Sequence, residues 1–258
     1  MSSAPIRQVR WARRIIALLA VVGALATSVP TAAAQTRIDL RQFYPNFEMV
    51  ESGQYLEGFN YISGSPARSV LWFERGSEGR FKQYNWAPTD AQATCHWDEL
   101  QWRRGRLRYH TTHDGCGAVE RETTYTPAVE LMPRRWREGR SWNRSGRSDV
   151  THSEDGRIVC RGVTEWSASV LGWEEIHPGV EAIHVRSRQT TIWTEGQSES
   201  GCAVGYITPW QEDYYLMPDL PIDGGGTAPA FKRSVGGNLA GGPDQWNVWF
   251  DRWASLPE

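Results

Sequence analysis

The feature that most constrains the fold is a succession of short strand-like runs, recurring about every 8–12 residues between turn signals. Apolar and polar side chains alternate over residues 106–112, whereas residues 70–73 are apolar throughout. Turn residues separate such runs at 103–105 and 114–115. Over this part of the chain almost nothing repeats at the helical period. The pattern predicts an all-β protein, an antiparallel sandwich, barrel or curved sheet of about ten strands.

The first 34 residues have the three-part order of a secretory signal peptide. Four arginines precede an apolar run at 15–26, and the small residues 31–34 fit a cleavage site before Gln35. The rival interpretation is an uncleaved anchor, but the run is shorter than the ~20 apolar residues that span a bilayer. We expect residues 1–34 to be removed, which leaves a secreted or periplasmic protein with no membrane span.

The charge of the remaining chain excludes one class of partner. The formal net charge is −2, and removing four arginines with no acid changes it to −6 (−2 − 4). General nucleic-acid binding needs a basic surface, so we expect no nucleic-acid partner. No dinucleotide, phosphate-loop, zinc-protease or serine-nucleophile motif occurs, and we expect no cofactor.

Four cysteines occur in the chain, and their even number favours two disulfides in an exported protein. They are Cys95, Cys116, Cys160 and Cys202. A zinc site is the alternative, because His110 and His113 shortly precede Cys116 and His96 follows Cys95. In a strand, however, His110 and His113 would point to opposite faces. We therefore expect disulfides and no metal.

The pairing expected is sequential, Cys95–Cys116 and Cys160–Cys202. The first bond would join two strands of a hairpin that turns at residues 103–105. The rival pairs Cys116 with Cys202 and Cys95 with Cys160, which the symmetry of an internal repeat would favour. Sequential pairing is preferred because strands that are close in sequence most readily meet in space.

A weak internal repeat underlies that rival. Cys116 and Cys202 lie 86 positions apart (202 − 116), and the sequence Leu-Met-Pro recurs with Met132 and Met217 at an offset of 85 (217 − 132). The repeat suggests two related units, 45–132 and 133–218, within an all-β domain over 35–218. Chance recurrence of common turn residues is the alternative.

The C-terminal part, 219–258, differs in composition. Residues 219–243 are dense in Gly and Pro, which predicts a loop or an extended crossing. Trp246, Trp249, Phe250 and Trp253 then follow at i, i+3, i+4 and i+7, with Asp244 placed to cap a helix. The spacing predicts a short C-terminal helix that docks its aromatic face on the β domain.

The strongest basic feature is the sequence Arg134, Arg135, Trp136 and Arg137, with further arginines after it. It is a candidate ligand or anion contact, since guanidinium groups bind oxyanions in a planar, two-pronged way. The alternative is a solvated turn whose arginine stems cover tryptophan faces. We favour the turn, because the arginines have no fixed spacing.

Several carboxylates could form a glycosidase pair, which is defined by a separation in space that the sequence does not supply. They are Asp98, Glu99, Glu165, Glu174 and Glu175. Adjacent acids usually mark a solvated edge, so we assign no catalytic residue.

The chain holds 14 Trp, and 13 of them follow residue 34. Most should be core, but some partly exposed rings would suit a sugar, and a curved sheet could enclose an apolar ligand. We expect a secreted, disulfide-linked, non-catalytic module that binds a glycan or an apolar small ligand. An extracellular structural or interaction protein is the second expectation, and a hydrolase that uses carboxylates is the third.

Overall fold

The computed structural model describes residues 36–61, 66–85, 90, 93–239 and 245–255. The chain divides into two compact units, Met1–Thr36 and Arg37–Glu258, and the second is described below. The expected signal peptide and its cleavage junction lie outside the described residues.

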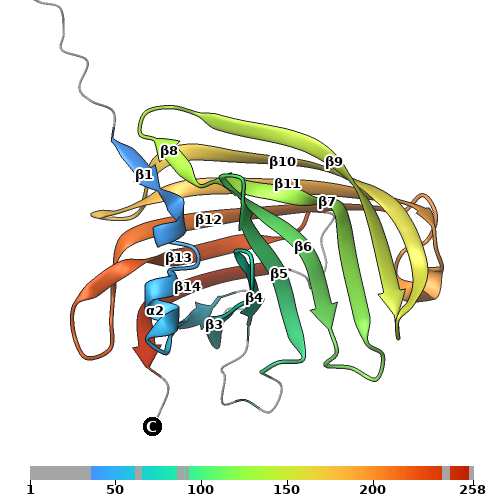
Figure 1. Ribbon diagram of the computed structural model, residues 1–258, viewed down its shortest axis with the longest axis horizontal. Coiled ribbons are helices and arrows are strands. Elements are labelled where there is room, and N and C mark those ends of the chain that lie inside the picture. Colours follow the sequence, from blue (N-terminus) through green and yellow to red (C-terminus); the bar gives the residue numbers. More distant parts are fainter. Residues whose placement is uncertain (1–35, 62–65, 86–89, 91–92, 240–244, 256–258) are drawn as a thin grey trace, which may run out of the picture. The chain divides into compact units, whose positions relative to one another are not determined.

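The second unit is an antiparallel β-barrel closed by twelve strands (Figure 1). The barrel strands are β2 (Gln54–Asn60), β3 (Ala67–Arg75), β4 (Arg80–Tyr84), β5 (His96–Arg103), β6 (Arg106–Asp114), β7 (Arg121–Pro133), β9 (Trp142–Glu154), β10 (Arg157–His177), β11 (Val180–Glu195), β12 (Ile207–Pro221), β13 (Thr227–Asn238) and β14 (Gln245–Ser255). Each pairs with its neighbour in sequence, β7 pairs with β9, and β14 pairs with β2 to close the sheet. The predicted all-β class is confirmed, and among its alternatives the structure is a barrel.

A short segment precedes the barrel strands. It consists of β1 (Arg37–Asp39), a 3-10 turn (Leu40–Gln42) and helix α2 (Phe47–Glu51). Strand β1 pairs with β8 (Arg135–Arg137) in a separate two-stranded ribbon. Asn46 begins α2 by accepting a hydrogen bond from the amide of Met49, and its own amide group donates to the carbonyl of Pro229 at 3.0 Å. The bond to Pro229 attaches the segment to β13.

The segment covers one end of the barrel, which we call the apolar end. There the inward-facing side chains of the strands pack with Leu40, Phe43 and Tyr44 into a single core cluster. Members of that cluster include Leu56, Phe73, Phe81, Leu100, Leu107, Met132, Ile183, Leu216, Phe231, Phe250 and Trp253. Burying such side chains stabilises a fold by roughly 1.5–3 kcal/mol each. The core therefore lies at the end that the N-terminal segment covers.

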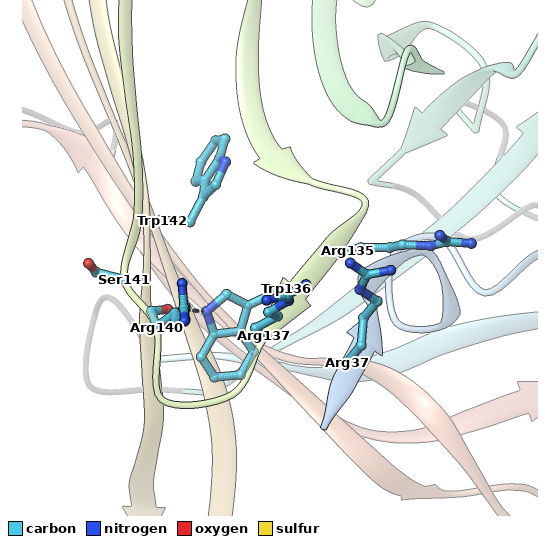
Figure 2. Close-up of a pocket in the computed structure, with 7 residues that line it drawn as sticks. All are labelled: Arg37, Arg135, Trp136, Arg137, Arg140, Ser141 and Trp142. Carbon is cyan, nitrogen blue, oxygen red and sulfur yellow. Dashed lines mark hydrogen bonds between the residues drawn. The ribbon is translucent and has the colours of Figure 1, made fainter. Parts of the chain in front are cut away.

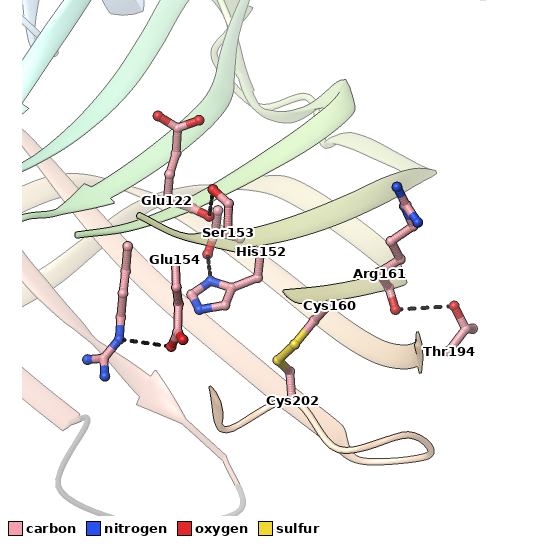
Figure 3. Close-up of a disulfide and its surroundings, with 10 residues drawn as sticks. Glu122, His152, Ser153, Glu154, Cys160, Arg161, Thr194 and Cys202 are labelled. Carbon is pink, nitrogen blue, oxygen red and sulfur yellow. Dashed lines mark hydrogen bonds and ion pairs between the residues drawn. A yellow bond between two sulfur atoms is a disulfide. The ribbon is translucent and has the colours of Figure 1, made fainter. Parts of the chain in front are cut away.

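The opposite end, which we call the polar end, contains both disulfides. Cys95–Cys116 joins the start of β5 to the chain just after β6, with Cα atoms 4.9 Å apart. Cys160–Cys202 joins the start of β10 to the loop after β11, with Cα atoms 6.2 Å apart (Figure 3). The structure thus contains the sequential pairing, and the hairpin of β5 and β6 turns at Arg104 and Gly105.

The C-terminal helix predicted from Trp246, Trp249, Phe250 and Trp253 is wrong, because these residues belong to strand β14. Trp246 and Phe250 face the interior, whereas Trp249 faces outward beneath Arg233. A β-bulge between Phe250 and Arg252 then changes the alternation and turns Trp253 inward. The helix-like spacing of the four aromatic residues therefore results from a strand with side chains on both faces and a bulge. The expected cap, Asp244, lies outside the described residues.

The loop predicted over residues 219–243 is also largely replaced by strands. Strand β12 continues to Pro221, and β13 occupies Thr227–Asn238. Gly224, Gly225 and Gly226 form the turn between them with positive φ angles, which only glycine adopts readily. The β unit therefore runs to Ser255, beyond the boundary expected at 218. The duplication of 45–132 and 133–218 stays a prediction.

Candidate functional site

The candidate site lies inside the barrel, where its lining changes from apolar to polar. Along β12 the inward-facing row runs Leu216, Tyr214, Glu212 and Trp210, because alternate residues of a strand share a face. Strand β5 shows the same change, from Leu100 at the apolar end to Asp98 and then His96. Two carboxylates, Asp98 and Glu212, therefore project into the barrel from strands that are distant in sequence.

Glu212 is held by hydroxyl groups. The phenol of Tyr214 donates to one carboxylate oxygen, and the hydroxyl of Ser234 donates to the other at 3.0 Å. The indole N–H of Trp246 donates in turn to Ser234 at 2.6 Å. Burial raises the pKa of Glu212 to about 7, against the lowering effect of those two hydrogen bonds, and the charge of Asp98 adds to the rise. Near neutral pH this side chain can therefore accept or donate a proton.

Asp98 is held in a similar way on the other side. The phenol of Tyr109 donates to it at 3.0 Å, and the hydroxyl of Thr112 donates at 2.9 Å. Burial raises its pKa, and this outweighs the opposing effects of the nearby His96 and of the two hydrogen bonds. Both carboxylates keep some solvent-accessible surface, so solvent reaches the interior of the polar half.

Three buried tyrosines accompany the two carboxylates. Tyr44, from the N-terminal segment, packs against Tyr214 with ring centroids 6.1 Å apart, and its phenol donates to Gln83. Burial raises the pKa values of Tyr44, Tyr109 and Tyr214 well above the usual range, and the charge of Glu212 reinforces the rise in all three. The charge of Asp98 adds to the rise in Tyr44 and Tyr109. We call Asp98, Glu212, Tyr44, Tyr109 and Tyr214 the lumen cluster.

Two tryptophans lie beside the cluster on the side of the polar end. The rings of Trp210 and Trp246 are 5.1 Å apart, and both side chains are half-buried. Gly236 lies opposite Glu212 and Trp246 in the sheet, and a Cβ there would come within 2.9 Å of the Trp246 ring. Glycine at this position therefore lets the indole lie against the wall. The arrangement combines aromatic faces with carboxylate acceptors and hydroxyl donors.

The arginine group predicted from sequence is divided by the structure. Trp136 is buried, with 3% of its surface exposed, and its indole N–H donates to the carbonyl of Arg140 at 2.6 Å (Figure 2). Arg134 pairs with Asp39 at 3.2 Å. Arg135 and Arg137 are exposed and line a surface pocket with Arg37 and Arg140. The group thus lies at the ribbon of β1 and β8 and takes no part in the lumen cluster.

The carboxylates considered in the sequence have different positions. Asp98 belongs to the lumen cluster, whereas Glu99 faces outward and pairs with Arg80 at 2.8 Å. Glu174 contacts His184 at 2.6 Å, Glu175 accepts from the amide of Gly179 at 2.7 Å, and Glu165 is exposed. Sequence reasoning missed Glu212. The signal that could have found it is the alternation of Glu212 with Trp210, Tyr214 and Leu216, a period of two that is typical of a strand.

The histidines once considered as zinc ligands are not assembled around the cysteines. His113 stacks on Trp97 with ring centroids 4.8 Å apart, and the sulfurs of Cys95 and Cys116 are bonded to each other. Among the residues that the structure describes, no group of three or more His, Cys, Asp or Glu side chains could hold a metal ion.

No family model matches the chain, and neither a curated protein nor a solved structure is significantly similar to it. Within the described ranges, no helix has the length and apolar character needed to cross a membrane.

Proposed function

We propose that the protein is a non-catalytic binding module that holds a polyhydroxylated ligand, such as a saccharide unit, in the polar half of the barrel. The observation that carries the proposal is the lumen cluster, with two inward carboxylates beside the half-buried rings of Trp210 and Trp246. Small-ligand sites typically combine aromatic walls with a few well-placed polar groups. Carboxylates accept hydrogen bonds from sugar hydroxyls, and indole faces contact the C–H faces of the ring.

An apolar ligand fits this interior less well. The apolar end is filled by its own buried side chains, including Phe81, Leu100 and Trp253, and Tyr44 packs among them. The solvent-accessible part of the lining contains the carboxylates instead. An apolar molecule placed there would remove water from Asp98 and Glu212 without replacing its hydrogen bonds, which is unfavourable.

A saccharide titration tests this proposal. Neutral mono- and disaccharides would be titrated while tryptophan fluorescence and binding heat are recorded, and we expect Asp98→Asn or Trp246→Phe to weaken binding at least tenfold. Glu99→Gln is the matched control, since Glu99 follows Asp98 on the same strand but faces outward. Equal saccharide affinity in the Asp98→Asn protein and the wild type would show that the lumen cluster is not the binding site. Binding of a fatty acid but of no saccharide would favour an apolar-ligand carrier.

A hydrolase is the second candidate, and the pKa of Glu212 is the observation that favours it. A carboxyl group with a pKa raised to about 7 can act as a general acid, and Asp98 lies close enough for its charge to affect that pKa. Release of reducing ends from a glycan, lost in both Glu212→Gln and Asp98→Asn, would identify an enzyme. Binding without turnover would support the binding module as proposed. If the protein showed neither binding nor turnover, an interaction protein would be favoured instead.

We also infer that the protein acts outside the cytoplasm, as a secreted or periplasmic protein. Two disulfides are compatible with an oxidising compartment, and the order of charges and apolar residues before Gln35 supports export. N-terminal sequencing of exported protein should begin near Gln35. Retention of residues 1–34 in that material would contradict the inference.

A further inference from the structure

The ribbon of β1 and β8 carries a concentration of positive charge that the proposed function does not use. Arg37, Arg135, Arg137 and Arg140 line a hollow of about 350 Å³, together with Trp136, Ser141 and Trp142 (Figure 2). We call this hollow the arginine pocket. No carboxylate is among the residues that line it. Glu138, in the turn that follows β8, lines a different hollow.

The register of the ribbon places like charges together. Arg37 lies directly opposite Arg137, and Asp39 lies opposite Arg135. Because side chains alternate along a strand, these four residues share one face of the ribbon, while Ile38 and Trp136 face the core. Like charges placed directly opposite each other on neighbouring strands destabilise the pair. The arrangement would therefore gain stability from a bound anion.

The one acid on that face is already engaged by other arginines. Asp39 accepts from Arg41 at 3.0 Å and from Arg134 at 3.2 Å. Burial acts to raise the pKa of Asp39, but the hydrogen bonds from these arginines outweigh it and the pKa is lowered. Within the described part of the chain, the side chains of Arg37, Arg135 and Arg137 have neither an ion pair nor a hydrogen bond. Their charge is not neutralised by the fold.

The pocket is built on buried residues. Trp136 is almost fully buried and its indole N–H holds the carbonyl of Arg140, which fixes the turn after β8 against the core. Gly139 in that turn has a φ of 72°, a conformation that favours glycine. The amide of Leu40 donates to the carbonyl of Arg134 at 2.7 Å and fixes the other strand. The backbone that carries the arginines is thus set before any ligand arrives.

We propose that the arginine pocket binds an oxyanion, a phosphate group, between Arg37, Arg135 and Arg137. Guanidinium groups present paired N–H donors that match tetrahedral oxyanions, and a planar fork loses little freedom on binding. A phosphate held here relieves the repulsion between Arg37 and Arg137. The site lies on the ribbon and not on the lumen cluster, so it stands independently of saccharide binding.

A phosphate titration at low ionic strength tests the site. Inorganic phosphate would be added while NMR follows the indole of Trp142 and the arginine side chains, with sodium chloride of equal ionic strength as the reference. We expect saturable shifts in the wild type and at least tenfold weaker binding in Arg37→Gln and Arg137→Gln. Arg157→Gln is the matched control, because Arg157 is exposed, has the same charge and lies at the start of β10, away from the ribbon. Loss of binding in all three variants, or equal shifts with chloride, would overturn the proposal.

Melting curves separate binding from folding. Without phosphate, Arg137→Gln should melt at the wild-type temperature or slightly above it, since a like-charge pair is removed. Phosphate should raise the melting temperature of the wild type and not that of the variant. A lower melting temperature for the anion-free variant would mean that Arg137 serves the fold, against the proposal. Phosphatidylglycerol vesicles then identify the source: sedimentation with vesicles that requires Arg137 indicates a lipid phosphate, whereas binding of inorganic phosphate alone indicates a small solute.

Discussion

The two ends of the barrel are stabilised by different physical means. At the apolar end, the N-terminal segment covers a cluster of buried side chains that includes Trp253, Phe81 and Leu40. At the polar end the inward-facing residues include Asp98, Glu212 and Trp210, which keep some accessible surface. Hydrophobic burial supplies most of the stability of a fold, so the second end needs other constraints.

The disulfides supply such constraints at the polar end. Cys95–Cys116 lies beside the start of β5, close to Asp98, whereas Cys160–Cys202 packs with Val150 and Trp193 in a small apolar cluster. Hydrogen bonds add to them, for example between Thr123 and the ring of His152 at 2.9 Å. His152 lies beside the second disulfide (Figure 3). The large core cluster at the apolar end therefore stabilises the barrel, while covalent and polar links hold the shape of the polar end. A binding site in the polar half therefore reduces the stability of the apolar core only slightly.

The largest expected effect tests the apolar end. Trp253 has no exposed surface, so Trp253→Ala leaves a cavity and should lower the unfolding free energy by about 3–5 kcal/mol. Trp210→Ala at the polar end removes a ring that is half-buried, and we expect roughly half that loss. Urea unfolding of the two variants measures the difference. Equal losses would break the distinction between the ends.

The disulfides provide the next largest effect. Replacing Cys160 and Cys202 by Ser opens a loop of 42 residues, and the chain-entropy model gives a loss of about 4 kcal/mol. The Cys95–Cys116 bond spans 21 residues, for which the same model gives about 3 kcal/mol. Hydrogen exchange should increase first in the polar halves of β10 and β11 when the larger loop is opened. Increased exchange at the core residues instead would mean that the bond supports the apolar end.

Glu212 makes the polar end sensitive to pH. In the unfolded chain its carboxyl group titrates near 4.5, whereas burial keeps the proton on the folded protein up to about pH 7. Stability should therefore fall as the pH rises from about 4.5 to about 7, by about 3 kcal/mol from this group. Glu212→Gln should remove that part of the dependence and be more stable than the wild type at pH 8. Urea unfolding at pH 5 and pH 8 measures it, and identical pH dependence in both proteins would refute the assignment.

The sequence predicted local features of this fold better than those that depend on closure. The β5–β6 hairpin and the sequential disulfides followed from turn residues and from the spacing of Cys95 and Cys116. The β14 strand did not, because a bulge between Phe250 and Arg252 is set by its partner β2, which starts almost 200 residues earlier. Local patterns carry no information on such partners.

The same reason explains why Glu212 and the tyrosines of the candidate site were missed. Asp98 could be named as a candidate from sequence, but nothing in the sequence joins it to Glu212, which lies on β12. Only closure of the barrel brings β5 and β12 to face a common interior. The arginine group shows the converse, since neighbours in sequence are divided between the core at Trp136 and the surface at Arg135 and Arg137.

The smallest expected effect concerns the hydrogen bonds of the lumen cluster. Ser234 donates to Glu212 at 3.0 Å and accepts from the indole of Trp246 at 2.6 Å, so Ser234→Ala leaves both partners without that bond. A buried hydrogen bond contributes about 1 kcal/mol, and its loss should be larger at pH 8 than at pH 5, because the donor stabilises the ionised carboxylate. The pKa of Glu212 should therefore rise further in this variant, which NMR of its side chain measures.

Ser255 provides the matched control for this last variant, since it is exposed at the end of β14 and accepts from Gln54 at 2.8 Å. Ser255→Ala should change the unfolding free energy by less than about 0.5 kcal/mol at either pH, as surface substitutions usually do. If the loss of unfolding free energy in Ser234→Ala is the same at pH 5 and pH 8, the hydroxyl of Ser234 does not stabilise the ionised form of Glu212. In that case the polar end would be held by packing of Trp246, and the contrast between the two ends would rest on burial alone.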